Sequence, residues 1–223
     1  MKKILLLSDT HGFILPIKGK YDMILHAGDF SPNKYGPRNS FFDAQYQHNW
    51  ILDEYIPWIK TLETDHFIQI PGNHELICKH ESLKKMPWPN NAHYLEDEHL
   101  TIDGIKIYGS PWQKWFCDWM FNAPEGDEKE LFLQEKYSHI EDDTNIILSH
   151  GGVFGYADKT PDGTLTGSRE LLKTLDRIKP TLVCTGHIHF DYSTVKYRST
   201  TIVNASIVDE GYEIANEPVI FEI

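Results

Sequence analysis

The sequence predicts an α/β fold, and three observations support this prediction. Short apolar runs rich in Ile, Leu and Val recur along the chain, and each is followed by a turn-forming residue. Segments with helical periodicity separate several of these runs. The length of 223 residues suits one domain spanning residues 1–223, which can bury roughly 70% of its unfolded surface without a disulfide or a structural metal.

The apolar runs predict buried strands, because such runs are typical of strands that are covered on both faces. In chain order they are Lys3–Leu7, Met23–His26, His66–Ile70, Lys106–Tyr108, Asn145–Leu148 and Thr181–Cys184. The last part of the chain predicts a more antiparallel region, with strands joined by short turns. These strands are Tyr192–Val195, Ser199–Val203 and Pro218–Ile223.

Helical periodicity predicts helices at Ser40–Leu62, Glu128–Ile140 and Gly167–Ile178. Pro57 should kink or interrupt the first of them, because proline lacks the amide hydrogen that a helix interior uses. Ser168 is a candidate N-cap of the last one. The Trp-rich segment Ser110–Phe121 matches no regular element.

Acidic residues dominate the charge: 33 Asp and Glu against 21 Lys and Arg give a formal net charge of −12. Such a surface repels polyanions, so long nucleic acids and membranes are not expected partners. The 40% apolar and 13% aromatic residues exclude a disordered polyelectrolyte. No apolar run reaches the length of a signal peptide or the roughly 20 residues of a membrane span, so we expect a cytoplasmic protein. The three cysteines should be buried and reduced.

Polar residues follow five of the predicted strands, at the points where those strands end. The five segments are Ser8-Asp9-Thr10-His11-Gly12, His26-Ala27-Gly28-Asp29-Phe30, Pro71-Gly72-Asn73-His74-Glu75, Ser149-His150-Gly151-Gly152 and Thr185-Gly186-His187-Ile188-His189. Ligands of open α/β sheets bind beyond the carboxyl ends of the strands, so these loops should converge on one place. The small residues in them allow a close approach of the backbone to a ligand.

Two Asp, one Asn and several His in these loops indicate a metal site. Carboxylate, amide oxygen and imidazole, without thiolate, suit Mn, Fe, Zn, Ni or Co in five- or six-coordinate sites. Seven ligands are too many for one open catalytic metal, but they suffice for two divalent ions that share a carboxylate. Such ions lie about 3.5–4 Å apart and turn a bridging water into a nucleophilic hydroxide. We expect two divalent ions here, with Mn as the first candidate.

These motifs resemble those of the calcineurin-like metallophosphoesterases, which run Asp-x-His, Gly-Asp, Gly-Asn-His-Asp/Glu, His and Gly-His-x-His. All five occur here in that order, between Asp9 and His189, and the resemblance covers nearly the whole chain. It implies a four-layer sandwich of two mixed β-sheets flanked by helices. It also implies a metal-dependent hydrolase of phosphoric esters.

The resemblance further implies roles for single residues. One metal would be bound by Asp9, His11 and His189, and the other by Asn73, His150 and His187, with Asp29 bridging both. His74 would bind no metal and would lie beside the phosphate, as would Asn73. There the imidazole of His74 can protonate the leaving oxygen. Glu75 fits a supporting role, such as orienting His74. Two divalent ions against two carboxylates leave a positive excess that attracts a phosphate.

The surroundings of the motifs look most like a branch of this family that hydrolyses cyclic nucleotides or other phosphodiesters. This implies a small phosphodiester substrate, with nucleotides as the first candidates. Protein phosphatases of the superfamily carry arginines where this chain has Phe30-Ser31-Pro32 and Ile70-Pro71, which disfavours phosphoprotein substrates. A phosphomonoesterase or a nuclease on the same centre remains an alternative. A non-catalytic scaffold is another, although scaffolds of this fold lose ligand residues that are intact here.

Several further residues are weaker candidates. Trp112 and its aromatic neighbours could wall a pocket for a nucleobase, or they could pack in the core. Candidate phosphate-facing cations, with solvated surface charges as the alternative, are Arg38, Lys114 and Arg169. His26 is expected to pack near the site or support a ligand.

Overall fold

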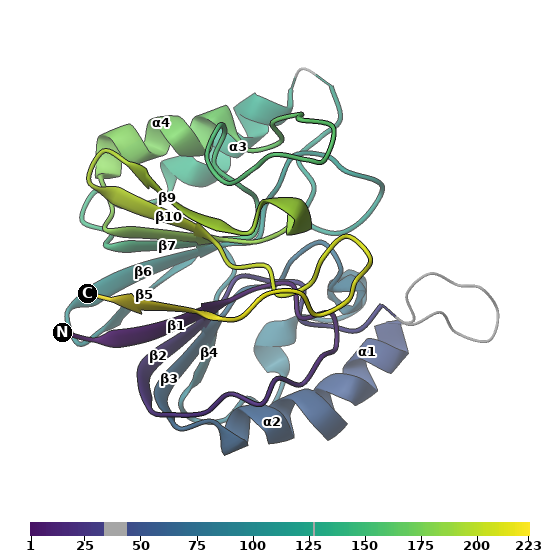
Figure 1. Cartoon of the computed structure of the whole chain (residues 1–223). Helices are drawn as coiled ribbons and strands as arrows, with labels where there is room; N and C mark the ends of the chain where they lie inside the picture. Colours follow the sequence, from purple (N-terminus) through teal and green to yellow (C-terminus); the bar gives the residue numbers. More distant parts are fainter. Residues whose placement is uncertain (34–43, 127) are drawn as a thin grey trace.

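The computed structural model describes residues 1–33, 44–126 and 128–223. In these residues the chain forms two mixed β-sheets that lie face to face, with helices on the outer face of each (Figure 1). The predicted fold class, a four-layer α/β sandwich, is therefore confirmed.

The first sheet has the strand order β11-β1-β2-β3-β4. Its strands are β1 (Lys3–Leu7), β2 (Tyr21–His26), β3 (Thr64–Gln69), β4 (Ala92–Tyr94) and β11 (Val219–Glu222). The strands from β1 to β4 are parallel, and β11 pairs antiparallel with β1. The chain ends thus lie beside each other at the edge of this sheet (Figure 1).

The second sheet has the strand order β5-β6-β7-β8-β10-β9. Its strands are β5 (Glu98–Ile102), β6 (Ile105–Ser110), β7 (Ile146–Ser149), β8 (Leu182–Thr185), β9 (Ser193–Tyr197) and β10 (Thr200–Asn204). The central strands are parallel, whereas β5 and β9 are antiparallel edges. The antiparallel character predicted for the end of the chain is confined to β9 and β11. The sequence did not predict β4 and β5, because β4 is very short and β5 carries polar residues instead of an apolar run.

The helices are α1 (Ala44–Trp50), α2 (Ile56–Thr61), α3 (Lys129–Ser138) and α4 (Arg169–Ile178). Short 3₁₀ turns occur at Leu76–Lys79, Leu83–Lys85 and His189–Asp191. A π-helical turn, Ile51–Tyr55, joins α1 to α2 just before Pro57, so the predicted interruption is confirmed. The predicted helical residues 40–43 lie outside the described residues. Ser168 caps α4, because its hydroxyl accepts hydrogen bonds from the amides of Glu170 and Leu171.

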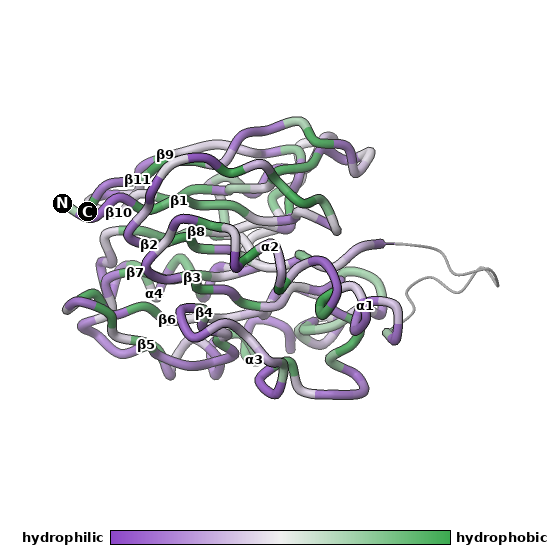
Figure 2. The backbone as a smooth tube through the Cα atoms, turned by 90° about the horizontal axis from the view of Figure 1, so that it is seen from below, coloured by the Kyte–Doolittle hydropathy of each residue, from purple (hydrophilic) through white to green (hydrophobic). Residues whose placement is uncertain are grey.

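Alternating side chains of β1 face two different cores, as the pleat of a strand requires. Ile4 and Leu6 lie between the two sheets, whereas Leu5 and Leu7 pack beneath α1 and α2. A third core lies between the second sheet and the helices α3 and α4. Figure 2 shows the hydrophobic stretches gathered on the strands, with mostly hydrophilic loops around them. The strands are therefore fixed from both faces, and their ends are available for a site.

The cysteines are free in the structure, and their burial differs. Cys184 is buried in β8 and Cys78 is half-buried, whereas Cys117 is exposed. The prediction of burial was wrong for Cys117, because this residue lies in a surface loop and not on an apolar strand. Among the described helices, none has both the length and the apolar composition needed to cross a bilayer.

Candidate metal centre

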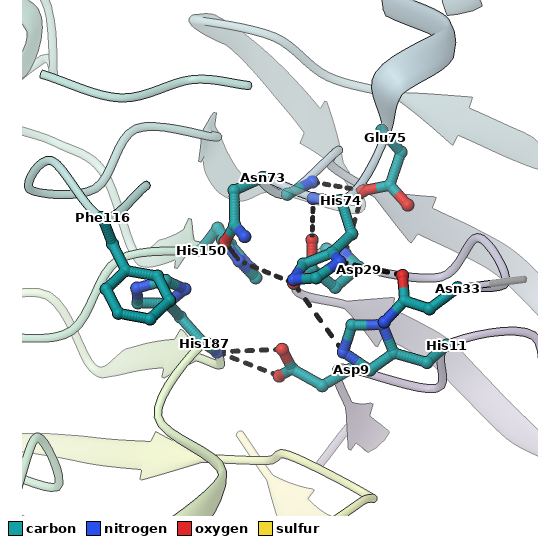
Figure 3. Close-up of polar contacts among 12 residues, drawn as sticks. Asp9, His11, Asp29, Asn33, Asn73, His74, Glu75, Phe116, His150 and His187 are labelled. Carbon is teal, nitrogen blue, oxygen red and sulfur yellow. Dashed lines mark hydrogen bonds and ion pairs between the residues drawn. The ribbon is translucent and has the colours of Figure 1, made fainter. Parts of the chain in front are cut away.

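The five polar loops converge at the carboxyl ends of the parallel strands, as the sequence predicted (Figure 3). Backbone hydrogen bonds join them: the amide of Asp9 donates to the carbonyl of Gly28 over 2.9 Å, and the amide of Gly186 donates to the carbonyl of His150 over 3.3 Å. The first bond links two loops of one sheet, and the second links two loops of the other. The bond from the amide of Ser8 to the carbonyl of Ala205, 2.9 Å, connects the two sheets.

Asp9, His11 and His189 form a first cluster of candidate ligands, which we call cluster 1. Nε2 of His189 lies 3.3 Å from Nε2 of His11 and 3.4 Å from Oδ1 of Asp9. Neighbouring ligands of one cation lie roughly 3 Å apart when the bonds to it are about 2.1 Å long. Cluster 1 therefore fits a divalent cation.

Asp29, His150 and His187 form a second cluster, cluster 2, which Asn73 joins. Nε2 of His150 lies 3.3 Å from Oδ2 of Asp29 and 2.8 Å from Oδ1 of Asn73. The donor set of carboxylate, amide oxygen and imidazole is one that borderline divalent metals accept. Cluster 2 fits a second cation by the same criterion of distance.

Asp29 is the member of cluster 2 that also faces cluster 1. Its Oδ1 accepts a hydrogen bond of 2.7 Å from the amide of His74, which fixes the carboxylate. Its Oδ2 lies 3.8 Å from Nε2 of His11 and 3.3 Å from Nε2 of His150. One oxygen thus faces a ligand of each cluster, which is the position that a bridging ligand needs.

Backbone carbonyls orient two of the imidazoles. Nδ1 of His150 lies 2.8 Å from the carbonyl oxygen of Ala27, and Nδ1 of His189 lies 3.0 Å from that of Asp209. A proton on each Nδ1 donates to the carbonyl and leaves Nε2 directed at the cluster. Ligating histidines of metal sites are held in this way.

Four of the candidate ligands have left-handed backbone conformations, which are uncommon outside glycine. The φ angles are 53° at Asp9, 42° at His11, 55° at Asp29 and 70° at His187. Strained residues of this kind cluster at functional sites, where the surrounding structure holds them. Gly186 allows the loops to meet, because a Cβ there would collide with the side chains of Ser8 and Asp9.

Glu75 has a different role from the one predicted. Its buried carboxylate accepts hydrogen bonds from the amides of Asp29 and Ser31, 3.0 and 2.9 Å, and from the amide of Gly72. Glu75 therefore ties the Asp29 loop to its own loop instead of orienting the ring of His74. The sequence could not reveal this, because the partner amides at 29 and 31 are more than 40 residues away.

The electrostatics of the site suit cations. Burial favours the neutral acid at Asp29, yet His150 beside it holds the pKa of this carboxyl well below its usual range. Burial also opposes a charge on His150, but the carboxylate of Asp29 raises its pKa to about 9. Protonated His150 thus places a positive charge among acceptor atoms. A metal cation can supply the positive charge at that place instead. Burial and the charge of Asp29 raise the pKa of Glu75 to about 7.

We expect the metal-free protein to lose stability in mild acid. Burial lowers the pKa of His11, His26 and His187 to about 3, so the folded state binds fewer protons there than the unfolded chain does below pH 6.5. The unfolding free energy should fall by about 1.4 kcal/mol per pH unit for each of the three. Glu75 offsets about one of these three contributions, because its raised pKa makes the folded state bind a proton that the unfolded chain lacks between pH 4.5 and about 7. Urea unfolding in a chelator at pH 6.5, 5.5 and 4.5 measures this. His26→Leu should reduce the pH dependence by about half, since the three histidines less Glu75 leave a net difference of about two protons. An unchanged or reversed dependence would contradict the expectation.

A cavity of about 500 Å³ opens beside cluster 2, and its wall includes Asn73, His74 and His187. Its Trp, Phe and Tyr residues are Trp115, Phe116, Trp119, Tyr137 and Tyr212. Phe116 is 52% exposed, and its ring centroid lies 6.0 Å from that of His187 (Figure 3). Such a volume is typical of small-molecule sites.

Trp112, the predicted substrate contact, does not line this cavity. Its ring packs edge to face on Phe121 and Phe132, and its indole nitrogen donates to Oδ2 of Asp97 over 2.7 Å. The alternative of core packing is the correct one, because its Nε1 has a partner at Asp97 away from the site. Its neighbours Trp115 and Phe116 take the position predicted for it.

The candidate phosphate-facing cations fall in three different places. Lys114 lines the cavity, and its Nζ lies 3.3 Å from Oε1 of Glu130. Arg169 stacks on the ring of Phe154, 3.6 Å from its centroid, and does not line the cavity. Arg38 lies outside the described residues.

Two residues near the clusters were not predicted. Asn33 contacts Nδ1 of His11 and Nδ1 of His74 through its side-chain amide (Figure 3). Tyr212 covers cluster 1, with ring centroids 4.8 Å from His11 and 5.3 Å from His189. Neither belongs to a motif, so only the fold reveals them. Of the other histidines, His26 packs near the site, as predicted, with Nε2 3.0 Å from Oγ1 of Thr10.

Two clusters of candidate metal ligands, with the Asp29 carboxylate facing both, lie at the carboxyl ends of two facing sheets, and this arrangement suits a centre of two metal ions. The chain belongs to the calcineurin-like phosphoesterase family, since residues 2–191 match the model of that family. Members of this family depend on two metal ions. The resemblance of the five motifs is thereby confirmed.

Individual relatives agree with this membership. The chain is 33% identical over 242 residues to metallophosphoesterase domain-containing protein 1 of Homo sapiens, covering 97% of this chain and 69% of that protein. It is 27% identical over 236 residues to UPF0046 protein K07C11.7 of Caenorhabditis elegans, covering 99% and 75%.

Solved structures show the same fold at low sequence identity. The crystal structure of phosphopantetheinyl hydrolase from Mycobacterium tuberculosis superposes with a TM-score of 0.53 at 12% identity, covering 94% of this chain and 90% of that one. Another crystal structure superposes with a TM-score of 0.63 at 15% identity, covering 91% and 90%.

Proposed function

We propose that this chain hydrolyses small phosphodiesters, with cyclic nucleotides as the first candidates, at a centre of two divalent ions. The observation that carries the proposal is the placement of Oδ2 of Asp29, which faces His11 of cluster 1 and His150 of cluster 2. Two divalent ions bound there would activate a water for attack at phosphorus and offset charge on the phosphate oxygens.

The residues beside the clusters suit a phosphate ester. Nδ2 of Asn73 is buried and has no hydrogen-bond partner among the described residues, so it can donate to a phosphate oxygen. Nε2 of His74 lies 4.0 Å from Oδ2 of Asp29, and His74 lines the cavity. His74 is therefore the candidate proton donor.

The size and lining of the cavity favour a small ester with an aromatic group. The net charge of −12 repels a polyanion, whereas two cations would make the cleft locally positive. Trp115, Phe116 and Trp119 offer aromatic faces beside His74 and His187. A nucleobase stacks on such faces.

A comparison of initial rates tests the proposal. The Mn²⁺-loaded protein should hydrolyse bis(p-nitrophenyl) phosphate and cyclic AMP faster than p-nitrophenyl phosphate and a single-stranded oligonucleotide. A faster rate on the monoester would indicate a phosphomonoesterase, and a faster rate on the oligonucleotide would indicate a nuclease. No reaction with any substrate while the metals are bound would indicate a scaffold.

We expect Phe116→Ala to raise KM for a cyclic nucleotide about tenfold with little change in kcat, because a base stacked on an aromatic ring contributes about 1–3 kcal/mol. The KM for methyl p-nitrophenyl phosphate, which has no nucleobase, should rise less in Phe116→Ala. Leu131→Ala is the control, since Leu131 is 68% exposed and does not line the cavity. An equal change in KM for both substrates would contradict stacking on Phe116.

A further inference from the structure

Asn33 lies between a predicted metal ligand and the predicted proton donor. Its Nδ2 lies 3.0 Å from Nδ1 of His11, and its Oδ1 lies 2.8 Å from Nδ1 of His74. The two imidazole rings also meet edge to face, with centroids 4.8 Å apart (Figure 3). One side-chain amide therefore holds both rings.

An amide donates from its nitrogen and accepts at its oxygen, so it imposes opposite proton positions on the two rings. The Nδ1 that faces the amide nitrogen has to be unprotonated, and the Nδ1 that faces the oxygen has to carry a proton. A neutral imidazole has one N–H, so each choice at Nδ1 also determines Nε2. Asn33 thus links the proton position of His11 to that of His74.

In the arrangement of this structure, the amide nitrogen of Asn33 faces His11. His11 then carries its proton on Nε2, which lies 3.3 Å from Nε2 of His189. That proton also faces the carboxylate of Asp29, whose Oδ2 lies 3.8 Å from Nε2 of His11. His74 donates from Nδ1 to Asn33, so its Nε2 is unprotonated. In this arrangement Nε2 of His11 carries a proton and offers no lone pair to a cation.

A cation in cluster 1 needs the lone pair on Nε2 of His11. The proton then has to move to Nδ1 of His11, where it needs an acceptor. A 180° turn of the Asn33 amide supplies its oxygen as that acceptor and presents its nitrogen to His74. Nδ1 of His74 becomes an acceptor, and the proton of His74 moves to Nε2. Each ring keeps one proton, so the exchange is balanced.

We propose that Asn33 is a positioning residue that couples cation binding in cluster 1 to the presence of a proton on Nε2 of His74. A bound cation would thus favour the tautomer of His74 that can donate a proton from Nε2 to the leaving oxygen. As the bond from phosphorus to the leaving oxygen breaks, that oxygen keeps the electron pair and takes the proton from Nε2. The catalytic use of this proton rests on the proposed function, whereas the coupling itself does not.

The proton positions can be measured directly by ¹⁵N NMR of histidine-labelled protein, with Zn²⁺ as a diamagnetic cation. Without Zn²⁺ we expect the proton of His74 on Nδ1, and with Zn²⁺ we expect it on Nε2. In Asn33→Ala, addition of Zn²⁺ should not move it. The proposal is overturned if His74 keeps one tautomer in the wild-type protein throughout, or if the switch persists in Asn33→Ala.

Binding and kinetics give an independent test. Asn33→Ala should weaken one of the two Mn²⁺ sites about tenfold and lower kcat for an alkyl diester about 10–100-fold, with a smaller loss for a p-nitrophenyl ester, whose leaving group needs no proton. In a His74→Asn background, with Mn²⁺ at a concentration that saturates both sites, Asn33→Ala should cause no further loss of kcat on the alkyl diester. Equal losses for both esters, or a further loss in that background, would contradict the coupling.

Asn49→Ala is the matched control, because Asn49 is an exposed asparagine of α1 whose side chain accepts a hydrogen bond from Gln45. It should change neither the tautomer of His74 nor the affinity for Mn²⁺. If the wild-type protein shows the switch but hydrolyses no diester, the proposed function fails and the coupling stands. If it hydrolyses diesters without the switch, the coupling alone fails.

Discussion

Asp29→Asn is expected to lower kcat/KM for phosphodiesters by about 10³-fold or more, because it removes the charge of the ligand that both metals would share. The substitution keeps the shape of the side chain and an oxygen that can accept the bond from the amide of His74. It replaces the oxygen between Nε2 of His11 and Nε2 of His150 by a neutral group. The fold should therefore survive while both metal sites weaken.

The measurement is the Mn²⁺ content after dialysis, taken together with the rate. We expect fewer than two ions per chain in Asp29→Asn. Asp176→Asn serves as the control, since Asp176 is a half-exposed carboxylate on α4 whose Oδ1 lies 2.9 Å from Nη1 of Arg198. Full metal content with full activity in Asp29→Asn would show that Asp29 does not bridge.

His74→Asn is expected to lower kcat about 10²–10⁴-fold, the range that one general acid contributes, and to leave two metals bound. His74 is held in place, because its backbone carbonyl accepts a bond of 2.7 Å from Gln47 and its ring contacts Asn33. Its ring also lies 4.0 Å from that of Trp119, measured between centroids. Asn removes the imidazole but retains a small polar side chain.

The dependence of the rate loss on the leaving group distinguishes a proton donor from a metal ligand. The loss in His74→Asn should be greatest for an alkyl diester and smallest for a p-nitrophenyl ester, because a good leaving group departs without a proton. His139→Asn is the control, since His139 lies on the surface after α3, 3.6 Å from Glu135. Loss of a metal from His74→Asn, or equal losses on both esters, would contradict the role as proton donor.

The sequence predicted much of the fold and the convergence of the site, for a physical reason. Buried parallel strands consist of apolar runs, and the residues that follow them must meet at one edge of the sheet. Asp9 and Asp29 could therefore be placed together, since they follow neighbouring strands of one sheet, whereas His150 follows a strand of the other sheet and joins them because the two sheets lie face to face. That they bind metal stays a prediction, as does the role of His74.

Contacts between loops could not be predicted in this way. Glu75 supports the backbone of the Asp29 loop, and Asn33 joins His11 to His74, through bonds that span from 22 to 46 residues. No periodicity marks such partners. The Trp112 prediction was wrong for a similar reason: the aromatic segment contains both core and cavity residues, and only its folded path shows that Phe116 faces the cavity.

The central claim is that two ions bound on either side of Asp29 make this chain a phosphodiesterase. A titration of metal-free protein with Mn²⁺, with hydrolysis of bis(p-nitrophenyl) phosphate followed at each point, tests it most directly. The account predicts two ions per chain, a rate that depends on both, and almost no rate in Asp29→Ala. Protein that holds two ions and cleaves no diester, or Asp29→Ala that behaves like the wild type, would contradict it.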